Sequence, residues 1–462
     1  MDRITLQQLS KDDLISLVLE QAGALARFAE QVAALTGRVS ALETKLGQPP
    51  KTPDNSSVPP SRGQKPNRGQ KPNRAERRET KPKGRPGSFR TLSEVPDRTV
   101  TVLANACPHC SLALAPEDQT EIHAYDHIDL PPILPVVTRV LRHRGTCPCC
   151  RRAFSAPAPE GLAPGSPFGP GIVALVVHLH VTQAIGFERL SRLMAEVFGL
   201  AISEGAISNI LARAEAPLTR AADAIAASVR ASKVIASDET TARVMGQTWW
   251  QWVLTSSTAV YHLIADTRGA KVVVDFLAGA KPDVWVADRY AGQNNHGVER
   301  QVCLAHLLRD AQYAIDSGDA ALGPGFKHLL KRALAIGRRR HTLKDSTLAQ
   351  YRADLDRRLG RLLATPPPTP AGRKLARAIK RCRSDLFVFV TRRDVPATNN
   401  TSERALRPSV IFRKVTGCFR SRWGTRLYAA AISVIATGRL KGMSALQAIT
   451  DALDRAPAPV IP

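Results

Sequence analysis

Residues 233–240 read Lys-Val-Ile-Ala-Ser-Asp-Glu-Thr, a short apolar stretch that ends on carboxylates. Residues 248–255 and 259–265 follow as two segments of strand length separated by Ser-Ser-Thr, which is typical of an antiparallel hairpin. A helical pattern at 269–278 comes next, and residues 282–288 form a further apolar segment that also ends on an acid. Three strands, a helix and a fourth strand predict a mixed α/β sheet.

Two acids stand at corresponding places in this pattern. Asp238 and Asp288 each follow an apolar strand directly, so neighbouring strands would bring them together. A third acid, Glu403, lies in residues 399–407, Asn-Asn-Thr-Ser-Glu-Arg-Ala-Leu-Arg. Divalent ions such as Mg²⁺ bind few carboxylates and share substrate phosphate oxygens, so three converging acids favour a two-metal site. The alternative is local, because Asn400 and Glu403 also have the spacing of a helix capping box.

The charge balance narrows the class of partner. The chain has 462 residues, enough for about three domains, and 65 Lys and Arg against 40 Asp and Glu leave a net charge of +25. This excess predicts nucleic acid or an anionic membrane surface as partner. The longest apolar stretch, Gly171–Val181, falls short of the about 18 residues that a spanning helix needs. The N-terminus lacks the pattern of an export signal, so we expect a cytoplasmic, nucleoid-associated protein without a membrane partner.

A heptad pattern occupies the N-terminal region. Apolar residues recur with spacings of four and three from Leu14 to Leu46, and Gln21 is the polar position in the series. This register is typical of a coiled coil, in which a polar position fixes the alignment of the partners. An amphipathic helix that packs on its own domain has the same pattern. We expect a leucine-zipper-like coiled coil in residues 1–48 and a homodimer or higher oligomer.

Residues 49–95 have the composition of a disordered basic linker. Pro, Gly, Asn, Gln, Lys and Arg replace aliphatic residues, and the unit Arg-Gly-Gln-Lys-Pro-Asn occurs from Arg62 and again from Arg68. Between Arg62 and Arg90 stand eleven Lys or Arg against two Glu. The segment is either a solvated spacer or an arm that binds DNA phosphates.

Two Cys-x-x-Cys pairs lie in residues 96–160, Cys107 with Cys110 and Cys147 with Cys150. Thiolates from two tight turns complete a tetrahedral structural zinc site. The spacer of about 36 residues is longer than that of the usual zinc ribbon and includes strand-like alternation at 136–141. Cys149 or His109 would compete as a ligand, and reduced surface cysteines are the alternative to a metal site.

Residues 161–231 have a helical pattern. Residues 187–212 read as helix, glycine-containing turn and helix, with Ser203 as a plausible N-cap of the second helix. A helix-turn-helix that enters a DNA groove has this pattern, and so do many helical packing units. We expect a DNA-binding region here.

Taken together, these motifs resemble those of the DDE transposases of the insertion sequence 66 family. The resemblance rests on Asp-Glu-Thr at 238–240, Asp288, Cys-Leu-Ala-His at 303–306, Asn-Asn-Thr-Ser-Glu-Arg-Ala-Leu-Arg-Pro at 399–408 and Gly-Arg-Leu-Lys-Gly-Met at 438–443. Relatives also carry an N-terminal leucine zipper, a linker with Asn-Ser-Ser-x-Pro-Pro-Ser, which stands here at 55–61, and a zinc-binding segment. The motifs occur in the same order as in the family, and together they cover nearly the whole chain.

The chain departs from the family pattern at two places. The family commonly has Arg-Lys-Asn-Trp after the third acid, whereas residues 413–416 read Arg-Lys-Val-Thr. A common glycine-tyrosine pair after the second acid is replaced by Arg-Tyr-Ala-Gly at 289–292. Both changes leave the acids intact and bear on the residues that bind transposon ends.

The resemblance implies a multidomain α/β protein with a ribonuclease H-like catalytic core and a helical insertion. Asp238 and Asp288 would lie on adjacent strands, and Glu403 would come from a later helix. The expected domains are the coiled coil at 1–48, the linker at 49–95, the zinc-binding segment at 96–160, the helix-turn-helix-like region at 161–231, the catalytic domain at 232–435 with its insertion at about 300–392, and a C-terminal helical tail at 436–462. The insertion is basic, so it would either widen the DNA-binding face or form a solvated helical lid.

The implied reaction is DNA strand cleavage and strand transfer at the terminal repeats of a bacterial insertion sequence. Two Mg²⁺ ions, or Mn²⁺ in their place, would be held by Asp238, Asp288 and Glu403. Seven cations surround the third acid in sequence, and a solvated helix face is the alternative to DNA contact. The expected DNA-binding residues among them are Arg404, Arg407, Arg413 and Lys414.

Two further residues lie near the second acid. Cys303 and His306 are three apart in a helical pattern and share a face. A metal site there would need two more ligands, which the spacing does not supply, so we expect helix packing with His306 near the catalytic carboxylates.

Two other functions remain open from the sequence. A DNA-binding regulator derived from a transposase would use the zipper, zinc segment and basic arm without any carboxylate triad. A structure-selective nuclease with the same fold would need no coiled coil to pair DNA ends. Relatives usually have accessory proteins encoded beside them, so such partners are also expected.

Overall fold

The computed structural model of the chain describes residues 10–46, 49, 51–56, 90–119, 124–162 and 164–454. The chain divides into two compact units. One comprises Met1–Gln64, Ser166–Phe187 and Gly205–Pro462, and the other comprises Lys65–Gly165 and Glu188–Glu204. Most of the expected basic arm, at 57–89, and the end of the expected tail, at 455–462, lie outside the described residues.

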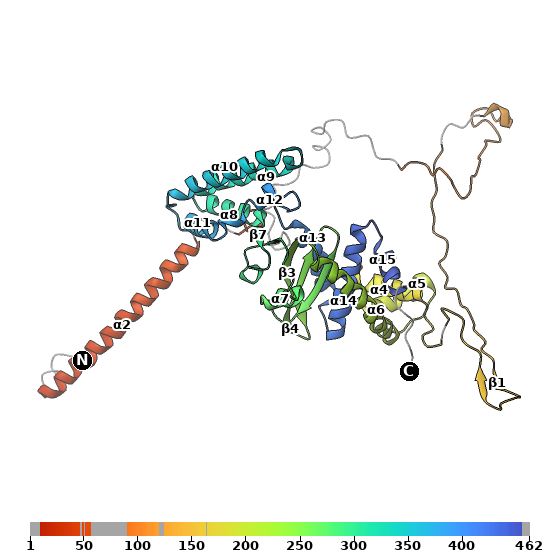
Figure 1. Cartoon of the computed structure of the whole chain (residues 1–462), viewed down its shortest axis with the longest axis horizontal. Coiled ribbons are helices and arrows are strands. Elements are labelled where there is room, and N and C mark those ends of the chain that lie inside the picture. The colour runs from red at the N-terminus through yellow and green to blue at the C-terminus, as the bar shows by residue number, and fades with distance from the viewer. Residues whose placement is uncertain are drawn as a thin grey trace. The chain divides into compact units, whose positions relative to one another are not determined.

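The larger unit is built on a mixed sheet, of which Figure 1 labels β3, β4 and β7. Its strand order is β5-β4-β3-β6-β7. The strands are β3 (Val234–Val244), β4 (Gln247–Thr255), β5 (Val260–Ala265), β6 (Val284–Ala287) and β7 (Glu299–Val302). β3, β4 and β5 are antiparallel neighbours, whereas β3, β6 and β7 run parallel. The hairpin and the mixed α/β sheet predicted from the sequence are confirmed.

Alternation along the strands gives the sheet two apolar faces. Ile235, Trp252 and Trp285 pack on one face with α6 (Glu204–Arg230) and α7 (Lys271–Leu277). Ala236 and Val286, one residue further along their strands, pack on the other face with the helices that follow β7. β3 and β6 are therefore buried on both sides along their apolar runs.

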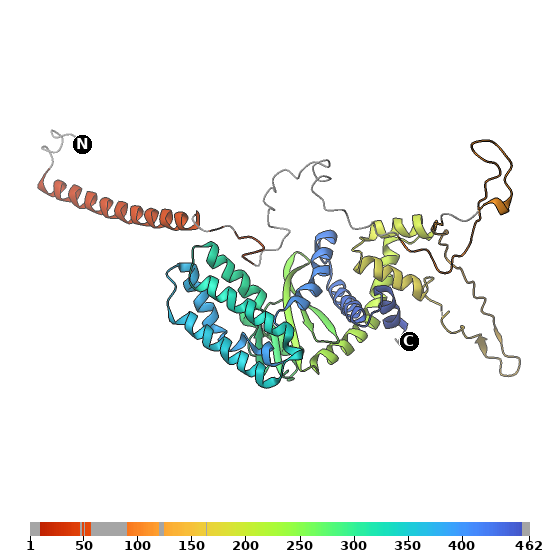
Figure 2. The ribbon, with the colours of Figure 1, turned by 90° about the horizontal axis from the view of Figure 1, so that it is seen from above.

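The segment after β7 folds into helices, as expected for an insertion. These are α8 (Leu304–Asp316), α9 (Leu322–Arg339), α10 (Asp345–Ala364), α11 (Pro370–Arg381) and α12 (Val388–Thr391). They lie together in Figures 1 and 2 and share one core, in which Phe326, Leu355 and Phe389 are fully buried. That core continues to Ala236 and Val286 of the sheet, so the insertion is anchored on the sheet itself.

The chain then returns to the sheet. α13 (Asn400–Thr416) packs against β3 and β4, and α14 (Arg422–Leu440) packs against β5. α15 (Ala445–Asp454) packs against α14 and also against α4 (Pro170–Val181). The expected domain boundary at 435 falls inside α14. This helix is continuous, and its apolar side chains are buried along most of its length.

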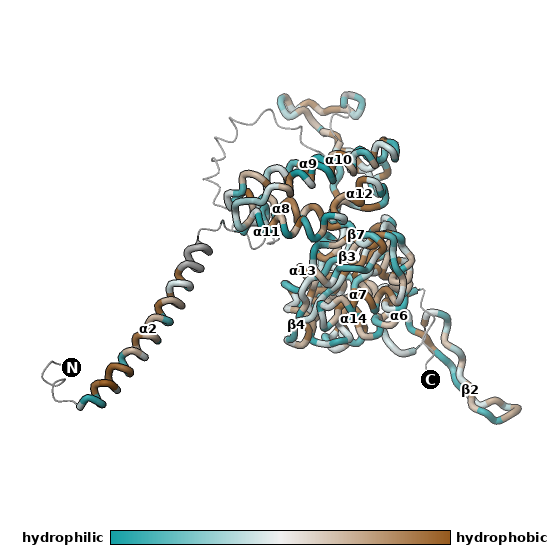
Figure 3. The backbone as a smooth tube through the Cα atoms, turned by 60° about the vertical axis from the view of Figure 1, so that its left-hand side comes forward, coloured by the Kyte–Doolittle hydropathy of each residue, from teal (hydrophilic) through white to brown (hydrophobic). Residues whose placement is uncertain are grey.

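The N-terminal heptad region forms one helix, α2 (Lys11–Leu46). Its apolar seam residues Val18, Leu25, Phe28, Val32 and Leu35 are all more than half exposed within the chain. Figure 3 shows apolar stretches recurring along this helix. A turn at residues 52–56 follows, and the buried Asn55 donates from Nδ2 to Oδ2 of Asp316 at 3.0 Å.

The smaller unit contains the cysteine pairs. β1 (Arg144–Thr146) pairs with β2 (Ala153–Ser155), and the second pair lies in the turn between them. A 3₁₀ turn (Pro116–Asp118) follows the first pair, and α5 (Phe187–Phe198) comes after the cysteine segment in the chain. Residues 136–141, which the structure describes, form no strand, so their alternation was a wrong guide to β-structure.

Candidate active site

Two carboxylates stand at equivalent positions on adjacent parallel strands. β3 pairs with β6 in a register that places Ala236 opposite Val286. Asp238 and Asp288 each lie two residues further along, so both side chains leave the same face of the sheet at neighbouring positions. The structure thus brings together the first two acids that the sequence singled out.

The third acid reaches the same place from α13. Burial raises the pKa of Asp238 well above its ordinary value, and repulsion from the carboxylates of Glu239, Asp288 and Glu403 raises it further. Glu403 therefore lies within electrostatic reach of Asp238, although the two residues are far apart in sequence. α13 starts at Asn400, and no side-chain hydrogen bond caps it, so the alternative of a capping box is not what the structure forms.

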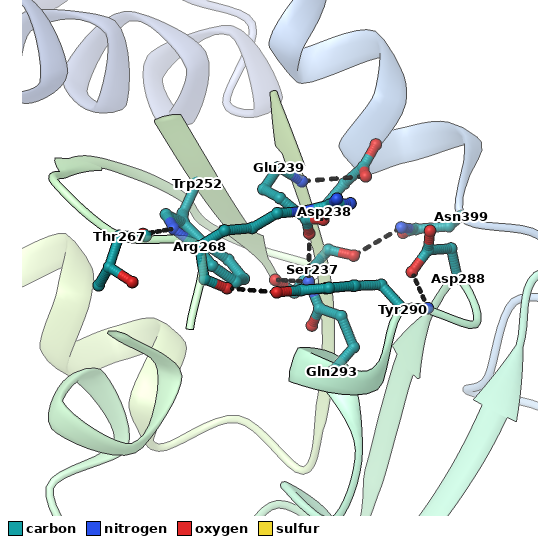
Figure 4. A network of polar contacts seen from close by, with 10 residues as sticks. All are labelled: Ser237, Asp238, Glu239, Trp252, Thr267, Arg268, Asp288, Tyr290, Gln293 and Asn399. Atoms are coloured by element: carbon teal, nitrogen blue, oxygen red, sulfur yellow. Dashed lines mark hydrogen bonds and ion pairs between the residues drawn. The ribbon is translucent and has the colours of Figure 1, made fainter. Parts of the chain in front are cut away.

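Glu239, next to Asp238, points to the other face of β3. Arg268 donates to its Oε1 from Nε at 2.9 Å and from Nη2 at 2.7 Å, and Gln293 donates to its Oε2 at 2.7 Å. The guanidinium of Arg268 also stacks on the ring of Tyr290, 3.8 Å from its centroid. Burial raises the pKa of Glu239, and these hydrogen bonds partly offset that effect. Figure 4 shows the network, in which Glu239 is fully engaged by protein groups.

Asn399 joins the segments that carry the acids. Its Nδ2 donates to the backbone oxygen of Ser237 at 2.7 Å, one residue before Asp238 (Figure 4). Its backbone N–H donates to Sγ of Cys303 at 3.1 Å, and its backbone oxygen accepts from Glu403 N–H at 3.1 Å. Cys303 N–H in turn donates to the oxygen of Ala287 at 2.9 Å, one residue before Asp288. One buried asparagine therefore links all three acidic positions.

His306 lies beside the third acid, as expected. Its Nδ1 is 3.8 Å from Oε1 of Glu403. Burial lowers the pKa of His306, against the opposite effect of the Glu403 carboxylate. Among the residues that the structure describes, neither of these two atoms has a hydrogen-bond partner, although both are buried.

The arrangement suits a hard divalent cation. Asp238, Asp288 and Glu403 offer carboxylate oxygens, which are the ligands that Mg²⁺ prefers in proteins. Burial raises the pKa of Asp238, and the nearby carboxylates raise it further, so a bound cation would favour its charged form. The buried, unpartnered Oε1 of Glu403 is a further free ligand atom in the described part of the chain.

The region that contains this site matches the model of a known protein family. The family model described as Transposase IS66 family matches residues 165–427, which is more than half of the chain. The chain belongs to the Transposase IS66 family. The matched region of this transposase includes all three acids, the sheet and the helical insertion. No curated protein matches the chain significantly.

The transposase keeps its two cysteine pairs in separate turns. Cys107 N–H donates to the Leu112 oxygen and Cys147 N–H to the Arg152 oxygen, both at 2.8 Å, so the two turns have the same local structure. Backbone N–H groups in each turn lower the pKa of Cys107 and of Cys147. The four thiols are not gathered into one ligand cluster in the described residues.

The cations after the third acid divide into two groups. Arg413 donates to the backbone oxygen and to Oγ1 of Thr241 in β3, and Arg426 pairs with Glu215 at 2.6 Å. Arg404, Arg407 and Lys414 are exposed. Because Arg407 and Lys414 follow Glu403 by four and eleven residues, they lie on the same face of α13 as the acid.

Sequence reasoning missed three residues that shape the site: Arg268, Gln293 and Asn399. No sequence motif marks Arg268 or Gln293, because their role depends on the direction in which the Glu239 side chain points. Asn399 stood in the motif at 399–408, but its role depends on contacts with Ser237 and Cys303 that are distant in sequence.

Proposed function

We propose that the chain is a catalytically active DDE transposase that cleaves DNA at the terminal repeats of an insertion sequence and joins the freed ends to a target. The observation that carries this proposal is the convergence of Asp238, Asp288 and Glu403 from β3, β6 and α13. Membership of the transposase family supports the same reaction.

The sheet supports a ribonuclease H-like core. That fold was expected to place the first two acids on adjacent strands and the third on a later helix. The parallel pairing of β3 with β6, and the position of Glu403 in the first turn of α13, agree with that expectation. The insertion of α8 to α12 lies between the second and third acids, as proposed for the helical insertion.

Asp238, Asp288 and Glu403 would hold Mg²⁺, with Mn²⁺ as a substitute. Bound divalent ions at such a site activate a water molecule and stabilise the departing oxygen. In the cleavage step, the water oxygen bonds to phosphorus and the bond from phosphorus to the 3′ oxygen breaks, which frees a 3′-hydroxyl. In strand transfer that hydroxyl bonds to a target phosphorus and displaces a target 3′ oxygen. Asn399 holds the segments that carry the acids in place throughout.

DNA phosphates near the scissile bond would contact α13. Arg404, Arg407 and Lys414 are exposed, and two of them share the face of Glu403. Arg413 contacts Thr241 and would bind DNA only with part of its guanidinium. A hollow of about 410 Å³ next to the start of β4 is lined by Arg243 and Arg420 and adds to this basic surface.

The outer segments would prepare the DNA ends. The two cysteine turns at 107–110 and 147–150 would close around one structural Zn²⁺, because thiols of lowered pKa at matching turns are good zinc ligands. α2 would pair with α2 of a second copy and so bring two DNA ends together, since its apolar seam is exposed in the single chain. α5 and the start of α6 would contribute to DNA binding, and accessory proteins would take part.

The experiment uses DNA that carries the ends flanking this gene, in the presence of Mg²⁺. Wild type is compared with Asp288→Asn at matched DNA occupancy. The proposal predicts that wild type nicks the end and joins it to target DNA, and that the variant binds the DNA but does neither. If the wild type and the variant form the same products, the proposed triad is wrong. If both bind and neither cuts, either an accessory protein is missing or the chain is the non-catalytic DNA-binding protein that stands as the alternative. Adding the accessory proteins separates the two, because a chain that still does not cut is the binding protein.

A further inference from the structure

A second set of ligand atoms adjoins the three-carboxylate site. Cys303 immediately precedes α8, His306 lies in the first turn of α8, and Glu403 lies in the first turn of α13. One ligand atom from each lies within 4.8 Å of the other two. The sequence alone provided Cys303 and His306, and the structure adds Glu403 as a third member from nearly 100 residues further along the chain.

The set contains atoms that lack the partners expected of buried polar groups. Nδ1 of His306 and Oε1 of Glu403 are 3.8 Å apart, and within the described ranges neither makes a hydrogen bond. Buried polar atoms are nearly always satisfied, so two that face one another point to a missing species between them. An acceptor nitrogen, a carboxylate oxygen and a nearby sulfur are together suited to a cation.

The donor types select the kind of cation. Sulfur and imidazole nitrogen are ligands of zinc and similar borderline ions, whereas Mg²⁺ prefers oxygen. Zinc bonds of about 2.0–2.3 Å place tetrahedral ligand atoms about 3.3–3.6 Å apart. The separation of 3.8 Å between Nδ1 and Oε1 therefore needs to shrink by less than about 1 Å. Three protein ligands leave a fourth position for water.

The surroundings of Cys303 hold its sulfur in place. Sγ accepts the backbone N–H of Asn399 at 3.1 Å, and the residue is fully buried. Burial raises the pKa of the Cys303 thiol, and the backbone N–H groups of Asn399, His306 and Ala305 offset only part of that effect. Cation binding would release the thiol proton to solvent and leave the sulfur where the backbone already fixes it.

We propose that Cys303, His306 and Glu403 form a binding site for Zn²⁺ or a similar borderline cation, next to the carboxylate site and sharing Glu403 with it. Glu403 then has two uses that compete. When it binds zinc together with the thiol and the imidazole, it is withdrawn from Asp238 and Asp288. The consequence for catalysis rests on the proposed function, because it requires Glu403 to serve the cleavage reaction, whereas the site itself does not.

The test measures Co²⁺ binding to the full chain, without DNA or Mg²⁺, by the absorbance of the bound ion and its thiolate charge-transfer band. The cysteine turns at 107–110 and 147–150 would also bind cobalt if they form the proposed zinc site, so the measured quantity is the difference between wild type and variants. We expect Cys303→Ser and His306→Asn each to bind one Co²⁺ per chain fewer than wild type. Asp288→Asn alters the carboxylate site, which has no sulfur ligand, so it is expected to leave the thiolate charge-transfer band as strong as in wild type.

Two controls make the result decisive. Cys382→Ser changes another buried cysteine, whose Sγ contacts the Ala378 oxygen, and should leave cobalt binding unchanged. If Cys303→Ser fails to fold, as judged by circular dichroism, His306→Asn alone decides. The proposal is overturned if His306→Asn binds the same number of Co²⁺ ions as wild type. That outcome is independent of the cleavage assay, so failure of this site and failure of the transposase activity are distinguished.

Discussion

Asp238 and Glu239 are adjacent in sequence and have opposite surroundings. Glu239 is held by Arg268 and Gln293, and its side chain is only 1% exposed. Among the described residues no comparable cation acts on Asp238, which is instead close to the carboxylates of Asp288 and Glu403. A strand places consecutive side chains on opposite faces, so only one of the two acids can join the triad. Asp238, on the side of Asp288 and Glu403, is the acid that we propose for the triad.

The raised pKa of Asp238 predicts how the metal-free protein responds to pH. The unfolded chain releases this proton near pH 4, whereas the folded chain keeps it to a higher pH. The stabilising effect is therefore complete below about pH 4 and is lost as the pH rises toward the folded pKa. Asp238→Asn should raise the melting temperature at pH 7 when Mg²⁺ is omitted, and the increase should vanish near pH 4. Thermal unfolding followed by tryptophan fluorescence tests this, with exposed Asp454→Asn as control. A shift that is equal at both pH values would contradict the assigned surroundings.

The network around Asn399 predicts a cost in stability. Asn399→Ala removes the bond to the Ser237 oxygen and leaves that buried group without its donor. The free energy of unfolding should fall by about 1–3 kcal/mol. The matched control is Asn400→Ala, whose side chain is exposed and should change stability by less than about 0.5 kcal/mol. Urea denaturation of both variants measures the difference, and equal effects would remove Asn399 from its linking role.

The residue scale also shows what the sequence could provide. Each acid follows a strand or opens a helix, which is a local pattern and can be read directly. The choice between Asp238 and Glu239 depends on Arg268 and Gln293, which lie 29 and 54 residues after Glu239. The contacts of Asn399 with Cys303 and Ser237 span 96 and 162 residues. Contacts between residues so far apart in sequence cannot be predicted from the spacing of neighbouring residues.

At the scale of elements, apolar runs predicted strands correctly where the structure buries both faces of the strand. β3 and β6 are buried on both faces, so their continuous apolar runs predicted strands correctly. Residues 136–141 have similar alternation but no buried face, since Val136 is 94% exposed, and they form no strand. Similarly, the second helix of the expected helix-turn-helix extends to Arg230, because its later apolar residues pack against the sheet.

The exposed seam of α2 predicts association through this helix. Leu25→Lys combined with Val32→Lys places two charges in the seam and should convert the oligomer to monomers. Ala26→Lys combined with Ala33→Lys adds the same charges one residue further along, outside the seam, and should leave the oligomer intact. Sedimentation equilibrium measures the mass of each variant. Equal masses for the two double variants would mean that α2 does not mediate association.

At the scale of the whole molecule, the positive charge is concentrated in one segment of the sequence. The net charge is +25, and eleven Lys or Arg lie between Arg62 and Arg90. No helix in the part of the chain described by the structure combines the length and apolar character needed to cross a membrane. The excess positive charge is thus consistent with the polyanionic partner inferred from composition.

The basic segment predicts a salt dependence. If about half of its cations contact phosphates, each contributes about 0.9 to the slope of log affinity against log salt. Replacing the eleven Lys and Arg at 62–90 with Gln, at constant length, should reduce that slope by about four to five. Fluorescence anisotropy with end DNA over a range of salt concentrations measures it. An unchanged slope would make this segment a spacer.

The central claim is that three acids from separate segments hold one metal site. The most direct measurement is anomalous diffraction from crystals of the chain, bound to end DNA and soaked in Mn²⁺. The account predicts density coordinated by Asp238, Asp288 and Glu403, with Glu239 still bound to Arg268. Density coordinated by Glu239 in place of Asp238, or no density at these carboxylates, would contradict it.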